Sequence, residues 1–392
     1  MNLSDRWRTR SPFHKDSHEE WAHTVRRFLN HEAAPNIDKW ELERMVPRDF
    51  HRKAGAVGIL GLGFPEEYGG ISEGIDVFHH LTQVDEISRI GSGGLNAGLT
   101  LHKLALTAIL EIGPDAMKRR IAPEIISGEK IIAMAITEPS GGSDVAAFKT
   151  RADRRGDRYI INGSKIFITN GIRADYYLTV ARTGGAGMDG LSLMLVDGGV
   201  SGPQKTPLEK MGYHSSDTAA LYFDDVETPV ENLVGPENGG FSALRGIFNY
   251  DRLMMAQHSC SFARICLEEA IDWAKQRETF GKRLGQHQVI RVKLANMMRQ
   301  VEATQAWVDL CAWHHIQGTS SAADLAMLKV QATLTLEAVA RDASQVLGGA
   351  SVLLGSKVER LNREVRINAI AGGSEEIMLD LAGRQLGFGS EG

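Results

Sequence analysis

The stretch AMAITEPSGGSDV, residues 133–145, decides the fold of this chain. It begins as a short apolar strand and then breaks at Pro139 and at the glycines Gly141 and Gly142. Small residues in such a loop leave backbone N–H groups and hydroxyls open to a ligand that comes close. An ordinary polar turn is the alternative interpretation of this loop.

A second stretch, INGSKIFITNG at residues 161–171, favours the ligand interpretation. Asn162–Gly163 predicts a hairpin turn, and a strand with Phe167 and Thr169 on one face follows it. An aromatic ring and a hydroxyl two residues apart suit the face and edge of a flat heteroaromatic ring. The two stretches together predict a ligand site in a β domain.

The segments on either side of this β domain have helical patterns. Residues 1–130 are predicted to form a helical domain, because Trp21, Val25, Phe28 and Leu29 repeat on one helical face. Further helical segments are predicted around residues 81–90 and 95–112. Short alternating runs predict the β domain at 131–240. Long periodic segments predict an antiparallel helix bundle at 241–392, with helices near residues 250–277, 288–317, 322–347 and 374–386. The predicted fold class is α+β with three domains.

Composition excludes several classes of partner. The net charge is −5, from 44 basic and 49 acidic residues without a run of like charges, so no nucleic-acid partner is expected. Three cysteines without a CxxC pair indicate a reducing compartment. The longest apolar stretch, residues 54–64, is too short and too rich in glycine to insert into a membrane. A cytoplasmic protein is therefore expected.

Familiar metal and nucleotide motifs are missing. In HEEWAH, residues 18–23, the histidines are five apart, whereas a metal-binding helical face needs a spacing of four, so no metal site is expected. GLGFPE, residues 61–66, lacks the third glycine of a dinucleotide fingerprint, and neither GxxxxGK[ST] nor GxSxG occurs. A bound nucleotide would use neither a Rossmann turn nor a P-loop.

The sequence resembles the acyl-CoA dehydrogenase family of flavoproteins. The motifs that carry the resemblance span nearly the whole chain in the family's order: ITEPSGGSD, GSKIFITNG, QRETFGKRLGQHQ (276–288), QVLGG (345–349) and GGSEEIM (372–378). It implies FAD as the cofactor, with an N-terminal helical domain, a middle β barrel-like domain and a C-terminal four-helix bundle.

The resemblance also implies where FAD binds. Phe167 stands where the family usually has Trp, Thr169 is expected near the flavin N5, and Ser143 near the flavin phosphate or the substrate. Around the same flavin it places Met134, Ile136, Thr137, Ser374 and Glu376. From a neighbouring subunit, the pyrophosphate and adenine are expected to meet Arg277, Thr279, Phe280, Gln288, Gln345, Gly348 and Gly349. The family's usual Gly–Tyr after this last segment is Ser351–Val352 here.

The catalytic base has two known positions in the family. One lies two residues before the hydroxyl residue that Ser374 matches, and here it is Gly372, whose backbone N–H is expected to bind the thioester oxygen. The other, in long-chain and isovaleryl-type enzymes, is matched by Asp251 in FNYDRLMMAQ, which makes Asp251 the candidate base. Glu375 and Glu376 are interpreted as charges in the first turn of a helix that Ser374 caps.

The substrate is expected to contact Ser143, Phe248 and Arg252, and Arg252 is expected to lower the pKa of Asp251. The alternative for Asp251 is an acidic residue in a helix's first turn. The implied reaction is oxidation of a saturated acyl-CoA to the trans-2-enoyl-CoA in fatty acid metabolism, with electrons passing to an electron-transfer flavoprotein. A homo-oligomer, most often a tetramer, is implied. The alternatives are a flavin monooxygenase or acyl-CoA oxidase of the same fold, and a non-catalytic flavin or acyl-CoA binding protein.

Overall fold

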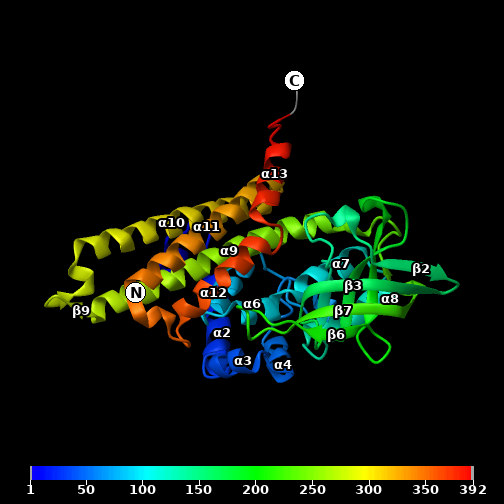
Figure 1. The fold of residues 1–392 in the computed structure, drawn as a ribbon, viewed down its shortest axis with the longest axis horizontal. Helices are drawn as coiled ribbons and strands as arrows, with labels where there is room; N and C mark the ends of the chain where they lie inside the picture. Colours follow the sequence, from blue (N-terminus) through cyan, green and yellow to red (C-terminus); the bar gives the residue numbers. More distant parts are fainter. Residues whose placement is uncertain (1, 390–392) are drawn as a thin grey trace.

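The computed structural model describes residues 2–389 and has helical parts at both ends of the sequence with a β-sheet between them. Figure 1 shows an elongated molecule in which the long C-terminal helices lie on one side and the sheet on the other. Among the described residues, no helix is both long enough and apolar enough to cross a membrane. The α+β fold class predicted from the sequence is confirmed.

The N-terminal part consists of short helices around an apolar core. Val25, Phe28 and Leu29 are buried on α2 as predicted, while Trp21 is half-buried. The segment Leu95–Ile112, predicted as one helical segment, divides into two helices at Leu101. The helices of this part are α1 (Leu3–Arg10), α2 (Asp16–Glu32), α3 (Ile37–Glu43), α4 (Arg48–Ala56), α5 (Val77–Ser88), α6 (Gly93–Thr100), α7 (His102–Ile112) and α8 (Asp115–Ile126).

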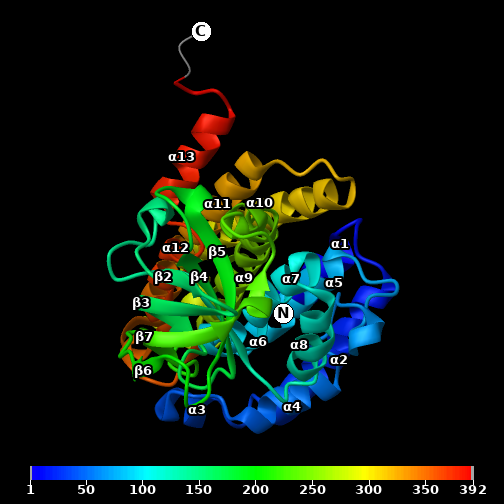
Figure 2. The same cartoon turned by 90° about the vertical axis from the view of Figure 1, so that its right-hand side faces the viewer.

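The middle part is a sheet with the strand order β6-β7-β3-β2-β4-β5-β8, and β1 pairs with β4. This path ends at β6 and β8, so the described strands form an open sheet. Figure 2 shows α7 and α8 beside it. The strands are β1 (Ile132–Ala135), β2 (Arg151–Arg155), β3 (Arg158–Thr169), β4 (Tyr176–Arg182), β5 (Leu191–Asp197), β6 (Gln204–Pro207), β7 (Thr218–Pro229) and β8 (Leu233–Val234).

Both faces of this sheet are covered. On β4, Tyr177 and Ala181 belong to one apolar cluster of the sheet, whereas Leu178 and Val180 pack in the cluster that contains residues of α7 and α8. Alternate residues of a strand point to opposite faces, which explains the division. The hairpin turn predicted at Asn162–Gly163 is wrong, because β3 continues through these residues and only its register with β7 shifts there.

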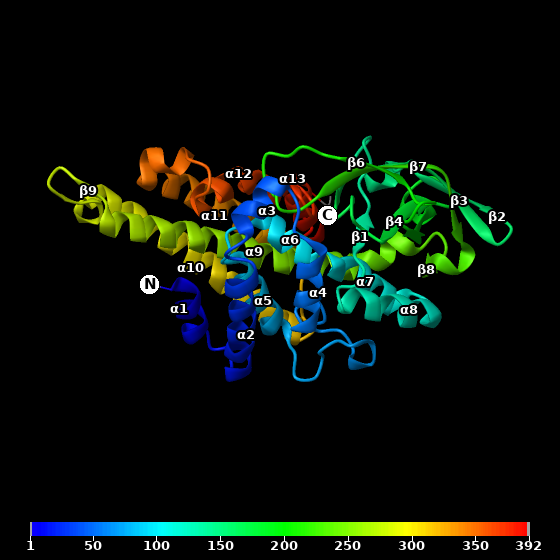
Figure 3. The ribbon, with the colours of Figure 1, turned by 90° about the horizontal axis from the view of Figure 1, so that it is seen from below.

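The C-terminal part is a bundle of long helices, which Figure 3 shows from below. The longest, α9, begins ten residues before the predicted Tyr250, because its first turns pack against the sheet through Gly240 and Leu244. The sequence prediction also missed α12. The elements of this part are α9 (Gly240–Gln276), the hairpin β9 (Glu278–Thr279) and β10 (Lys282–Arg283), α10 (Gln288–Ile316), α11 (Ala322–Leu347), α12 (Lys357–Ile370) and α13 (Glu375–Gln385).

Candidate active site

The loop after β1 and the C-terminal part of β3 form one partly accessible face of the sheet. The loop after β1 lies beside β3, where the Ile166 N–H donates a 2.9 Å hydrogen bond to the carbonyl of Thr137. A Cβ atom on Gly142 would come within 3.3 Å of Thr137 Cγ2, so the glycine loop folds back onto this strand end. The half-buried side chains on these segments are those of Met134, Ile136, Thr137 and Thr169.

A buried ion pair holds the two segments together. Lys165 Nζ on β3 lies 2.8 Å from the Ile136 carbonyl and 2.9 Å from Oε1 of Glu138. The other carboxylate contacts of Glu138 are the N–H groups of Lys149 and Thr150, which fix the far end of the glycine loop. Charge-assisted hydrogen bonds of this kind are stronger than neutral ones, so the loop has a rigid base.

Phe167 is the most exposed side chain of this face. It is 67% exposed and lies between Lys165 and Ile168, where the register of β3 with β7 shifts. Its φ is +61°, in the left-handed region that large side chains rarely occupy. An exposed aromatic ring in a strained backbone, on a face that also carries the half-buried Thr137 and Thr169, offers a surface on which a flat ring could stack.

The candidate base, Asp251, is half-buried on α9. Burial raises its pKa to about 6, and the neighbouring guanidinium of Arg252 opposes this change. The expected effect of Arg252 is therefore present, but burial outweighs it, and the net change in the pKa is upward. A carboxylate with this pKa is ionised at neutral pH and is a stronger base than an exposed Asp.

Gly372 faces Asp251 from the loop between α12 and α13. A Cβ atom on Gly372 would lie 4.0 Å from Oδ2 of Asp251 and 2.4 Å from Sδ of Met255. The φ of Gly372 is +67°, so a side chain there would also be strained. The two positions expected for the catalytic base thus lie close together, and of these two residues Asp251 is the one that carries a carboxylate.

Two glutamates, Glu375 and Glu376, follow this loop and lie at the start of α13. Ser374 caps α13 by accepting a hydrogen bond from the Ile377 N–H, and Glu375 and Glu376 lie in the first turn. The Glu375 carboxylate accepts a 2.7 Å hydrogen bond from the hydroxyl of Thr333. Glu376 is exposed, and its pKa is lowered chiefly by its own backbone N–H. The helix dipole favours both charges at this position.

The residues expected to contact the substrate lie on α9 and on the glycine loop. Arg252 donates a 2.7 Å hydrogen bond to Asn249, while its Nε atom is buried without a hydrogen-bond partner in the described part of the chain. Phe248 is half-buried and packs beside Phe241, with ring centres 5.9 Å apart. Ser143 is exposed. A buried donor without a partner is unusual, and a hydrogen bond to a ligand is one explanation for it.

The residues predicted to contact the flavin pyrophosphate and adenine lie far from Phe167 in the same chain. Figure 1 places the β9–β10 hairpin at the end of the bundle opposite the sheet. Phe280 on this hairpin is 96% exposed with a φ of +51°. The predicted residues on the hairpin and the adjoining ends of α10 and α11 are Arg277, Thr279, Phe280, Gln288, Gln345, Gly348 and Gly349. A single chain does not bring the two sets together.

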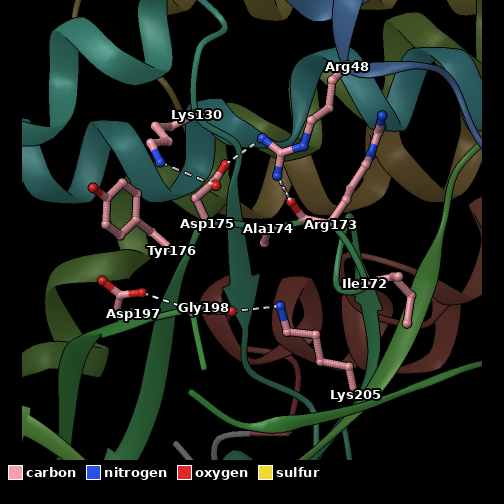
Figure 4. A pocket seen from close by; sticks show the side chains of 11 residues that line it. Arg48, Lys130, Ile172, Arg173, Ala174, Asp175, Tyr176, Asp197, Gly198 and Lys205 are labelled. Atoms are coloured by element: carbon pink, nitrogen blue, oxygen red, sulfur yellow. Dashed lines mark hydrogen bonds and ion pairs between the residues drawn. The ribbon is translucent and has the colours of Figure 1, made fainter. Parts of the chain in front are cut away.

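A polar cavity of about 330 Å³ lies elsewhere, between α4 and the sheet. Figure 4 shows Asp175 at its centre, paired with Arg48 at 2.9 Å and with Lys130 at 3.6 Å. Arg173, which also lines it, pairs with Asp217 at 2.8 Å. None of the predicted site residues lines this cavity. Its charges connect the N-terminal helices to the sheet.

One histidine cluster has the geometry of a metal site. Ligand atoms of His18, Asp76 and His79 lie within 4.8 Å of one another. Hydrogen bonds account for the arrangement, because Asp76 caps α5 and its Oδ1 lies 2.9 Å from His18 and 3.0 Å from His79. The absence of a bound metal stays a prediction.

The sequence reasoning missed the two buried lysines that support the site, Lys165 and Lys329. Lys329 on α11 is fully buried and binds the backbone on both sides of Gly372. A single charge inside an apolar helical stretch, as in AMLKVQA at 326–332, was the available signal. Charged residues are almost never fully buried unless they are paired or functional.

Comparison with known proteins shows the family to which this fold belongs. Models of the N-terminal, middle and C-terminal domains of acyl-CoA dehydrogenase match residues 15–129, 133–226 and 238–387. The long-chain specific acyl-CoA dehydrogenase of Sus scrofa is 33% identical, over 94% of this chain and 86% of that protein. A Mycobacterium smegmatis crystal structure assigned to the acyl-CoA dehydrogenases matches with a TM-score of 0.94 and 40% identity, covering 97% and 100% of the two chains. A glutaryl-CoA dehydrogenase of Mycobacterium smegmatis in complex with FADH2 has a TM-score of 0.89 at 26% identity, with 95% of each chain covered. The chain therefore belongs to the acyl-CoA dehydrogenase family.

Proposed function

We propose that this protein catalyses the FAD-dependent oxidation of a saturated acyl-CoA thioester to the trans-2-enoyl-CoA. The observation that carries the proposal is the meeting of Asp251 and Gly372 at one point, with an unpaired donor of Arg252 on the same helix. Membership of the family and the FADH2 complex of the glutaryl-CoA dehydrogenase support the choice of cofactor.

The flavin would be held by the face around Phe167, with Met134, Ile136, Thr137 and Thr169 along the ring. FAD, when bound, supplies an acceptor for the hydride that leaves the β-carbon of the substrate. The strained backbone at Phe167 fixes an aromatic surface for stacking before the cofactor arrives. Ser143, Ser374 and Glu376 lie in loops and first turns from which polar contacts to the cofactor or substrate would come.

Asp251 would remove the α-proton of the substrate. Its pKa of about 6 keeps it ionised at neutral pH, yet leaves it basic enough to accept a proton from a weak carbon acid. The Gly372 N–H would donate to the thioester oxygen and stabilise the charge that develops there. Arg252 would bind the CoA portion, because guanidinium is a bidentate partner for phosphate.

The oligomer is part of the proposal. Because the hairpin residues around Arg277 lie at the opposite end of the chain from Phe167, a complete flavin site would need a second copy of the chain. We propose a homo-oligomer, with a tetramer as the family's usual form. The proposed electron acceptor is an electron-transfer flavoprotein, and the proposed location is the cytoplasm.

Anaerobic mixing with straight and branched acyl-CoAs tests the function. Bleaching of the flavin band near roughly 450 nm by one class of substrate would support the dehydrogenase and define its substrate class. Rapid oxygen consumption by the substrate-reduced enzyme would instead support an oxidase or monooxygenase. A flavin that stays oxidised with every acyl-CoA would contradict both activities and favour a binding protein.

A further inference from the structure

Lys329 places a buried ammonium beside the loop that carries Gly372. The side chain comes from α11, and its Nζ lies 2.9 Å from the carbonyl of Ala369 and 2.9 Å from that of Gly373. Ala369 belongs to the last turn of α12, and Gly373 directly precedes the residue that caps α13. One side chain therefore bridges the two helix ends on either side of Gly372.

This ammonium is costly to bury. The residue is fully buried, and its hydrogen bonds go to the carbonyls of Ala369 and Gly373 rather than to a carboxylate. Burial lowers the pKa of Lys329 to about 8, although Glu375 opposes the change. The carbonyl end of α12 offsets part of the cost, since a helix C-terminus favours a cation. An apolar side chain would avoid the cost, so burial of an ammonium here points to a role beyond packing.

The loop needs external support because of its composition. Gly372 and Gly373 have φ angles of +67° and +104°, and glycine is free to leave such conformations. Two local contacts hold the flanks: the Ala371 N–H donates to Ile367, and Ser374 caps α13. Lys329 adds the contact that reaches both sides of Gly372 from a separate helix.

We propose that Lys329 is a positioning residue for the reaction: its two hydrogen bonds fix the loop so that the Gly372 N–H faces the thioester oxygen beside Asp251. Its positive charge also favours the negative charge that develops on that oxygen, without touching the substrate. This inference rests on the proposed function, since the thioester oxygen belongs to the proposed substrate. It adds to that function a residue outside the motifs by which the family is recognised.

The experiment compares Lys329→Met with Lys329→Gln and with a matched control, Lys205→Met. Lys205 also binds backbone from a half-buried position, with its Nζ 2.8 Å from the Gly198 carbonyl, and burial lowers its pKa as well. It lies on β6 and lines the polar cavity beside Asp175, so its contacts are with the sheet and not with the loop of Gly372. Hydrogen–deuterium exchange of the ligand-free holoenzyme measures the mobility of peptide 369–374. Anaerobic flavin reduction with an acyl-CoA measures the rate constant and the substrate affinity separately.

Lys329→Met is expected to accelerate exchange of peptide 369–374 and to lower the rate constant of flavin reduction by about 100-fold, with FAD content and substrate affinity nearly unchanged. Lys329→Gln, which keeps donors but loses the charge, is expected to fall between Lys329→Met and the wild type. Lys205→Met should change neither quantity. Wild-type exchange and wild-type reduction in Lys329→Met would overturn the proposal. If the wild type itself is never reduced, the proposed function fails, and the exchange data still decide whether Lys329 holds the loop.

Discussion

Oδ2 of Asp251 lies 4.0 Å from the point that a Cβ atom on Gly372 would occupy. The carboxylate lies on α9 and the glycine lies in the loop before α13, so two segments far apart in the sequence come together here. A carboxylate on either segment would therefore reach the same α-carbon of the proposed acyl-CoA substrate.

The first consequence concerns the identity of the base. Asp251→Asn keeps the shape of the side chain and removes its basicity, so flavin reduction by acyl-CoA should fall by several orders of magnitude while FAD and acyl-CoA still bind. Glu376→Gln is the comparison variant, because Glu376 is exposed in the first turn of α13 and glutamine at this position still offers a polar contact to the flavin or substrate. It should change the reduction rate little and the melting temperature slightly. The reverse pattern would place the base on α13.

The second consequence is that the base can be moved. In Asp251→Ala/Met255→Ala/Gly372→Glu, the new carboxylate starts from the loop, and the Met255 substitution removes the sulfur that would otherwise lie 2.4 Å from the new Cβ. The left-handed φ of Gly372 costs a non-glycine residue about 1–2 kcal/mol, so recovery should be partial. Flavin reduction should exceed that of Asp251→Ala/Met255→Ala at least tenfold. An equal rate in a folded, FAD-loaded triple variant would mean that the two positions do not serve the same α-carbon.

The third consequence is a pH dependence set by Asp251. Burial raises its pKa to about 6, and the base acts only when ionised. The second-order rate constant of flavin reduction at low acyl-CoA concentration, which reports the pKa of the free enzyme, should therefore rise about tenfold per pH unit below pH 6 and level off above it. The sign for stability is opposite: a raised pKa in the folded state stabilises at low pH, and this contribution is lost as the pH rises from about 4 through 6. Stability relative to Asp251→Asn, measured by denaturant unfolding between pH 4 and 8, checks this sign.

Much of the fold was predictable because helices and strands have different hydrophobic periods. α11 begins at Ala322 and ends at Leu347, as the periodicity indicates, since Ser321 caps its start and Gly348 follows its end. α12 was missed because its exposed face and its buried Arg360 and Glu364 make a largely polar sequence. The turn predicted at Asn162–Gly163 failed because pairing with β7 extends the strand through it.

The site was only partly predictable for a physical reason. Motifs gave the residues that would touch a flavin or a thioester, since these contacts require particular side chains. The buried lysines that support these residues bind backbone carbonyls, as Lys165 binds the carbonyl of Ile136. Every residue has a backbone carbonyl, so such a contact cannot be recognised from the sequence. The upward change in the pKa of Asp251 likewise depends on burial by distant segments, whereas the sequence shows only the neighbouring Arg252.

The last prediction concerns a flavin site shared between two copies of the chain. Phe167 lies in the sheet, whereas Arg277 follows α9 at the far end of the bundle, so each copy would supply one half of two different sites. Phe167→Asp and Arg277→Glu should each give a folded protein that loses FAD, because one places a charge under the ring and the other repels the pyrophosphate.

When the two variants are co-expressed with different tags, each mixed pair contains one site with both native halves and one site with neither. Tandem-purified mixed oligomers should therefore retain FAD, in about half of the sites of a mixed dimer and in a smaller fraction of the sites of a mixed tetramer, where like copies can also pair, although neither parent retains it. Lys282→Glu, a charge reversal on the same exposed hairpin, should keep its FAD and shows that a charge change there does not expel the cofactor by itself. Mixed oligomers as empty as their parents would mean that one chain supplies both halves, and the opposite ends seen in Figure 1 would then need another explanation.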